Sequence, residues 1–148
     1  PAGPDDARVA AGAGMADYIE ALSAHHGGPN EGAGAARAAH DMMRAQEVAL
    51  LQPLLDALAA RNDLHLIGPT EADSRAPTVA LDLHRDPLPV AAALAEHGIM
   101  AGGGDFYGVR PLEALGIDPA QGVLRVSFVH YTSPQEVAAL IEALDAVL

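Results

Sequence analysis

The residue best suited to chemistry in this sequence is an arginine within an alternating segment. Residues 122–133 read GVLRVSFVHYTS, which predicts a strand with Arg125 on one face and larger apolar side chains on the other. An arginine between valines either extends its charged end into water at an edge or points at an anion in a cleft. Its planar fork suits bidentate binding of a carboxylate. Both interpretations stay open, because Asp105 or Glu136 could pair with it.

A run of three glycines is followed by two of the five aromatic residues of the chain. The run fits neither GxGxxG nor GxxxxGK, and no helix is predicted directly after it, so we expect no nucleotide-binding fold. It could be only a flexible turn. A glycine-hinged loop with aromatic residues is, however, a common way to line or cover a pocket. We therefore predict an active-site loop formed by Gly102, Gly103, Gly104, Asp105, Phe106 and Tyr107.

Seven histidines in a chain without cysteine raise the question of a metal site. Asp82 and His84 would lie on the same face of one predicted strand, and His40 stands next to Asp41. None of the histidines has the HExxH spacing that places two ligands on one helix face. We therefore predict neither a structural nor a catalytic metal.

Two residue types that carry nucleophilic chemistry, cysteine and lysine, are missing altogether. The chain has no cysteine, which excludes a disulfide framework, a thiolate nucleophile and a cysteine-type zinc site within it. All eight basic residues are arginine, so a Schiff-base lysine and a P-loop lysine are excluded as well. The net charge of −12 argues against nucleic acid and anionic membrane surfaces as partners. No apolar run reaches the roughly 20 residues of a membrane span, and no signal peptide opens the sequence, so we expect a cytoplasmic protein.

The elements that must position these residues follow from periodicity and turn signals. The order is two helices, then strand–strand–helix–strand–strand–helix, which favours an α+β fold. We expect a small, mostly antiparallel sheet of three or four strands, with helices packed on one face and two helices before it. Pro53 should kink or restart the second helix. The predicted helices are 5–26, 36–61, 86–97 and a last one from the capping box at 133–136; the predicted strands are 64–67, 77–84, 99–101 and 122–133.

The C-terminal half resembles a known family. LRVSFVHYTSPQEVAALIEAL (124–144) resembles the closing segment of class V aminotransferases and cysteine desulfurases, which end in an Arg-x-Ser strand, a Tyr-Asn-Thr turn and a helix. GIMAGGGDFYGVRPLEALG (98–116) is similar to the loop before it in desulfurase-like proteins with a Phe-Tyr pair. AGPDDARVAAGAGMADYI is similar to the segment after the cofactor domain. The resemblance implies the small-domain fold of pyridoxal phosphate (PLP) transferases, with residues 1–34 as a connecting strap and helix and 35–148 as the C-terminal domain.

The resemblance also implies the C-terminal fragment of a larger enzyme that acts on an amino-acid substrate. In the family, an N-terminal PLP-binding domain holds the cofactor on a lysine, and that domain would lie upstream of Pro1. The parent protein would be a PLP-dependent enzyme and a homodimer. This chain alone should be inactive and bind no PLP, since it has no lysine. Without cysteine, the persulfide route of many desulfurases is excluded unless a thiol enters from elsewhere.

Three assignments carry over from the family to this sequence. Arg125 matches the arginine that grips the substrate α-carboxylate. Residues 102–107 match the loop over the active site. Gly3 matches the glycine of a Gly-Thr pair that reaches the cofactor phosphate of the neighbouring subunit, although Pro4 stands where threonine is usual and removes both the hydroxyl and the backbone donor.

A different function remains open: a stand-alone α+β module for small carboxylates or dimerisation, without catalytic activity. A missing large domain would leave apolar area exposed, either around Val123, Val129 and Tyr131 or on the first helix. The coding sequence upstream of Pro1 separates the two hypotheses.

Overall fold

The structure is a computed structural model that describes residues 5–148. It consists of two compact units, Pro1–Gln46 and Glu47–Leu148, and the helix α2 (Gly32–Ala59) runs through the boundary between them. The predicted division between residues 34 and 35 stays a prediction. Pro53 lies inside α2 and does not restart it, contrary to one form of our expectation. Within residues 5–148, no helix combines the length and apolar character that a bilayer crossing requires.

The first unit contains α1 (Asp6–His25) and the beginning of α2. Asp5 caps α1, as its side chain accepts a hydrogen bond from the Arg8 N–H at 3.2 Å. Small residues pack where the chain turns back: Ser23 is fully buried, and a Cβ at Gly28 would lie 2.6 Å from its Oγ. A side chain at position 28 would therefore crowd the buried Ser23 hydroxyl.

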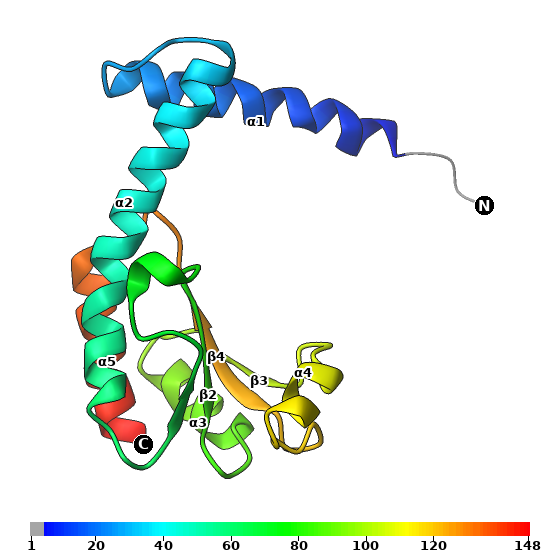
Figure 1. Ribbon diagram of the computed structural model, residues 1–148, viewed down its shortest axis with the longest axis vertical. Coiled ribbons are helices and arrows are strands. Elements are labelled where there is room, and N and C mark those ends of the chain that lie inside the picture. Colours follow the sequence, from blue (N-terminus) through cyan, green and yellow to red (C-terminus); the bar gives the residue numbers. More distant parts are fainter. Residues whose placement is uncertain (1–4) are drawn as a thin grey trace. The chain divides into compact units, whose positions relative to one another are not determined.

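The second unit is built on four strands: β1 (His65–Ile67), β2 (Thr78–Asp82), β3 (Gly102–Gly104) and β4 (Val123–Ser127). They form one sheet with the order β1-β2-β4-β3 (Figure 1), and all three pairings are antiparallel. Our α+β prediction is confirmed. In the register, Arg125 on β4 lies opposite Ala80 on β2 and Gly102 on β3. The helices that follow α2 are α3 (Leu88–Glu96), α4 (Val109–Ala114) and α5 (Pro134–Val147), with a short 3-10 turn at Ala72–Ser74.

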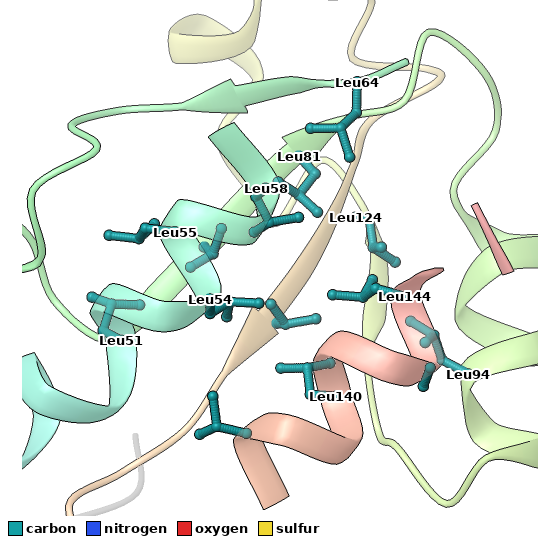
Figure 2. Close-up of a cluster of buried hydrophobic side chains, with 14 of the residues drawn as sticks. Leu51, Leu54, Leu55, Leu58, Leu64, Leu81, Leu94, Leu124, Leu140 and Leu144 are labelled. Carbon is teal, nitrogen blue, oxygen red and sulfur yellow. The ribbon is translucent and has the colours of Figure 1, made fainter. Parts of the chain in front are cut away.

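One face of this sheet is covered by a core made largely of leucine. Figure 2 shows leucines of α2, β2, β4 and α5 directed toward one another between the helices and the sheet. Leu81 and Leu124 come from the two central strands and are both fully buried. Branched aliphatic side chains can fill such a core without aromatic residues, which this sequence nearly lacks. The labelled members are Leu51, Leu54, Leu55, Leu58, Leu64, Leu81, Leu94, Leu124, Leu140 and Leu144.

The last helix begins as its sequence predicts. The Ser133 hydroxyl accepts from the Glu136 N–H at 3.2 Å, while the Glu136 carboxylate accepts from the Ser133 N–H at 2.7 Å. This reciprocal capping box satisfies donors that the helix itself cannot pair. It fixes where α5 starts, and α5 then buries Val137, Leu140 and Leu144 against the sheet.

Three predicted element boundaries are wrong. Residues 99–101 form no strand, and the glycine run itself is β3. The strand predicted over 77–84 ends at Asp82, because the backbone of His84 is left-handed (φ 53°). The strand predicted over 122–133 ends at Ser127, so its alternation does not extend to Tyr131. The helix α4 was not predicted; with only six residues it is too short for a helical periodicity to show.

Candidate functional site

Arg125 lies on the sheet face opposite the leucine core. Its neighbours in β4, Leu124 and Val126, are buried at 0% and 3% relative exposure, whereas Arg125 is exposed. The Cζ of its guanidinium lies 3.9 Å from the centroid of the Phe106 ring. This is a cation–π contact, in which the ring covers one face of the guanidinium. Arg125 is therefore a solvent-accessible cation with one side supported by an aromatic ring.

Neither carboxylate that could have paired with Arg125 does so. Asp105 accepts the Tyr107 N–H at 3.3 Å, and Glu136 belongs to the capping box. The pKa of the Glu136 carboxyl is lowered mainly by the hydrogen bond from the Ser133 N–H and, to a smaller extent, by the one from the Ser133 hydroxyl. Throughout residues 5–148, no ion pair between Arg125 and a carboxylate is formed. The fork of Arg125 thus remains available to an external anion.

The glycine run is a strand with close neighbours at Gly102 and Gly103 and a positive φ at Gly104. A Cβ at Gly102 would lie 3.0 Å from the Phe106 ring, and one at Gly103 would lie 3.1 Å from Pro87. Gly104 has φ 139°, and a Cβ at Gly122 would lie 2.4 Å from its carbonyl carbon. Real Cβ atoms do not approach that closely. Residues 102–104 therefore form a strand paired with β4 along its length, with both faces occupied, instead of the glycine-hinged loop that we predicted. Their role at an active site stays a prediction.

Residues 105–108 form a tight turn at the end of β3. The Gly108 N–H donates to the Asp105 carbonyl at 2.7 Å, and the two central residues, Phe106 and Tyr107, have φ values of 48° and 60°. Left-handed backbone at both central positions is the pattern of a type I′ turn. The Phe106 ring lies over Gly102, while Tyr107 is fully exposed. Of the predicted loop, the structure places Phe106 at Arg125 and directs Tyr107 into solvent.

A small apolar cluster supports this face of the sheet. Leu112 of α4, Ile117 and Val123 are buried together, with Phe106 and Ala80 packed against them. Val123 is only 4% exposed, because the segment that includes α4 covers it. The apolar area that we expected to be exposed around Val123 is therefore buried within this chain. Other apolar side chains are exposed, among them Val129 and Tyr131 after β4 and Val9, Met15 and Tyr18 on α1.

Asp82 and His84, which we considered as metal ligands, contact each other and a third residue of the chain. The buried Asp82 carboxylate accepts the His84 N–H at 2.8 Å and faces His84 Nδ1 at 3.2 Å and Gln121 Nε2 at 3.3 Å. These contacts fix the turn after β2. In the described part of the chain, no three histidine or acidic side chains are grouped as metal ligands would be. Gly3 lies outside the described residues.

Arg75 is a structural arginine to which no pattern in the sequence points. It donates to the carbonyls of Pro69 at 2.8 Å and Thr78 at 2.9 Å, and burial lowers the pKa of its guanidinium. Arg75 thereby ties the loop after β1 to the start of β2. Arg125 lies within an alternating segment of the sequence, whereas Arg75 stands before the strand predicted over 77–84. Nothing in the residues around Arg75 indicates that its guanidinium is enclosed, which only the tertiary structure decides.

A comparison with known protein families accounts for most of the chain. The family model described as aminotransferase class-V matches residues 35–140, which include Arg125, the glycine strand and the capping box. The chain belongs to the class-V aminotransferase family. The resemblance noted in the sequence is thereby confirmed. No curated protein matches the chain significantly.

Solved cysteine desulfurases share the fold of this class-V aminotransferase chain. An apo cysteine desulfurase from Thermococcus onnurineus is 25% identical, with a TM-score of 0.64 over 77% of this chain and 30% of its own. The Escherichia coli cysteine desulfurase CsdA gives 24% identity and a TM-score of 0.60 over 77% and 29%. A NifS-like protein from Rickettsia africae gives 17% and 0.61 over 77% and 32%. The chain thus matches about three tenths of the length of each.

The family depends on PLP, but the residues of this chain do not fit covalent binding of that cofactor. The family holds PLP on a lysine, and the sequence contains none. It also contains no cysteine that could carry sulfur. Any PLP chemistry would therefore need residues outside these 148.

Proposed function

We propose that this chain supplies the substrate-binding arginine and part of the active-site wall of a PLP-dependent enzyme acting on an amino acid. The cofactor would be held by a PLP-binding domain outside these residues. The observation that carries the proposal is the state of Arg125: its guanidinium is exposed, backed by Phe106 and not paired with a carboxylate of residues 5–148. The family match over residues 35–140 supports it independently.

The role of Arg125 follows from the geometry of its fork. A guanidinium presents parallel N–H donors that match the two oxygens of a carboxylate. The acidic chain, with a net charge of −12, would otherwise repel a carboxylate, so an unpaired arginine is the feature that gives the anion a place to bind. Ala80 lies opposite Arg125 in the sheet, and the Phe106 ring covers one face of its guanidinium, so the cation has apolar neighbours and no competing carboxylate.

The test uses the full-length polypeptide that carries these residues. L-alanine and L-alaninamide serve as probes, because they differ in whether a carboxylate is present. Arg125→Gln should weaken L-alanine binding about 10- to 100-fold, as expected for hydrogen bonds to a charged group. It should leave L-alaninamide binding and PLP content unchanged. Arg110→Gln, which removes an exposed arginine of α4, is the matched control.

Two results would contradict the proposal. One is an equal loss of L-alanine and PLP binding in Arg125→Gln, which would indicate a general structural defect. The other is no loss of either, or a loss equal to that of Arg110→Gln, which would show that Arg125 does not bind the carboxylate.

The family's dimeric architecture is also proposed for the full-length protein. Val9, Met15 and Tyr18 of α1 are 72%, 69% and 51% exposed, which favours burial of this helix against another surface.

A second candidate function is a self-contained small-carboxylate-binding or dimerisation module. It is supported by the leucine core of the second unit, which is closed by helices of that unit itself. The coding sequence directly upstream of Pro1 distinguishes the two. An in-frame PLP-binding domain with its lysine supports the enzyme, whereas a start codon at that place supports the module.

A further inference from the structure

The ring of Phe106 occupies a position defined by two residues that face each other in the sheet. Gly102 on β3 and Arg125 on β4 are direct cross-strand partners. A Cβ at Gly102 would lie 3.0 Å from the ring Cζ and 3.1 Å from Cε1, so the ring fills the space of the missing side chain. From there the ring reaches the guanidinium of Arg125, whose Cζ is 3.9 Å from its centroid.

We propose that Phe106 is a positioning residue that orients Arg125 for edge-on binding of a carboxylate. This inference rests on the proposed function of Arg125. An exposed arginine side chain samples many rotamers, and ordering it on binding costs entropy. A ring against one face restricts that sampling and blocks approach from that side. The N–H edge of the fork stays open, and this is the edge that binds a carboxylate through two hydrogen bonds.

The backbone around Phe106 shows how specifically the ring is held. Phe106 and Tyr107 both have left-handed φ values, which cost free energy for residues with a side chain. The turn is kept by the Gly108 N–H on the Asp105 carbonyl and by the Asp105 carboxylate on the Tyr107 N–H. Strained backbone of this kind concentrates at functional sites. Here the two left-handed residues reverse the direction of the backbone, so that the side chain of Phe106 lies on the sheet and that of Tyr107 lies in solvent.

The experiment uses the full-length polypeptide labelled with ¹⁵N-arginine. The Nε–Hε resonance of Arg125 is assigned by its loss in Arg125→Gln. In the wild type, the ring current of Phe106 should shift this resonance upfield relative to Phe106→Leu, and Phe106→Tyr should restore the shift. Phe106→Leu should weaken L-alanine binding by about 2- to 5-fold, the range of an exposed cation–π contact. Phe106→Tyr should bind nearly as the wild type does.

The control is Phe128→Leu, which makes the same change at the other phenylalanine of the chain. Phe128 packs against the leucine core, on the opposite side of the sheet from Phe106. This variant should leave both the Arg125 resonance and L-alanine binding unchanged. Unaltered resonances of the other arginines in Phe106→Leu show that the fold is kept.

The outcomes separate this inference from the proposed function. If Arg125→Gln weakens L-alanine binding but Phe106→Leu does not, the positioning role is overturned and the carboxylate site remains. An unshifted Arg125 resonance in Phe106→Leu also overturns it, because the ring would then not lie on the guanidinium. If Arg125→Gln has no effect on L-alanine, the carboxylate site itself is overturned.

Discussion

The two faces of the four-stranded sheet are built from alternate residues of the same strands, yet they differ in how far they are filled. On one face, Leu81 and Leu124 are fully buried under α2, α3 and α5 (Figure 2). On the other, a cluster around Leu112 and Val123 covers part of the surface and Arg125 stays exposed. Stability therefore depends mainly on the filled face. The open face can hold a charged side chain because it contains only a small part of the hydrophobic core.

Substitutions of two adjacent residues of β4, one on each face of the sheet, test most directly whether the two faces differ in their contribution to stability. Leu124→Ala should lower the free energy of unfolding by about 2–5 kcal/mol, because it removes a fully buried side chain and leaves a cavity. Arg125→Gln should lower it by no more than about 1 kcal/mol, because the side chain is exposed and loses only its cation–π contact with Phe106. Urea unfolding with an unchanged m-value measures both. Equal losses would show that the two faces contribute alike.

A second test concerns β3, the glycine strand at the edge of the sheet. Gly122→Ala places a Cβ within 2.4–2.6 Å of the Gly104 backbone, which cannot yield without moving β3. Gly116→Ala is the matched control, with φ 75° against 73° but open space around it. Both variants bear the left-handed penalty of about 1–2 kcal/mol. Gly122→Ala should cost about 1–3 kcal/mol more in urea unfolding because of overpacking.

If the two glycine variants lose the same stability, the close contact between Gly122 and Gly104 does not limit the edge of the sheet. In that case the glycine run would need another explanation than its crowded surroundings.

The smallest expected effect concerns the cap of α5, which covers the filled face. Ser133→Ala removes the hydroxyl of the capping box and should cost about 1 kcal/mol in urea unfolding. Ser127→Ala, at an exposed position of β4 on the open face, should stay within about 0.5 kcal/mol. A larger loss at Ser127 would contradict the assignment of stability to the filled face.

The same cap has a pH dependence whose sign follows from Glu136. Its pKa is lowered in the folded chain by the Ser133 N–H and hydroxyl, from an ordinary value of 4.5. Above pH 4.5, the pKa of the unfolded chain, this stabilisation of the folded state is fully present. It is lost as the pH falls from 4.5 through the lowered pKa of the folded chain. Ser133→Ala keeps the N–H but not the hydroxyl, so its urea midpoint should fall less between pH 7 and pH 3 than that of the wild type. An identical fall would show that the hydroxyl does not act on Glu136.

The elements with strong local signals were predictable. The alternation around Leu124, Arg125 and Val126 predicted which residues of β4 share a face, and the structure confirms it. The Ser133–Glu136 motif predicted the start of α5 to the residue. In both cases, neighbours in sequence determine the structure, through the two-residue period of a strand or the hydrogen bonds of a single helical turn.

The glycine run was misinterpreted because its conformation depends on residues far away in sequence. Glycine is usually a signal for a turn, and nothing within 102–104 indicates that Phe106, Pro87 and Gly122 occupy the surrounding space. A glycine within a predicted strand, as Gly122 is in 122–133, often marks close approach of another backbone and could have pointed to this contact.

The amino-acid sequence by itself determined the class of this fold, the side of the strand on which Arg125 lies, and the absence of any lysine or cysteine for covalent chemistry. Only the tertiary structure decided that Arg125 rests on Phe106 instead of pairing with Asp105 or Glu136. The reason is physical: periodicity and residue type act over a few bonds, whereas the partner of a long charged side chain depends on which distant segments the fold brings within about 4 Å.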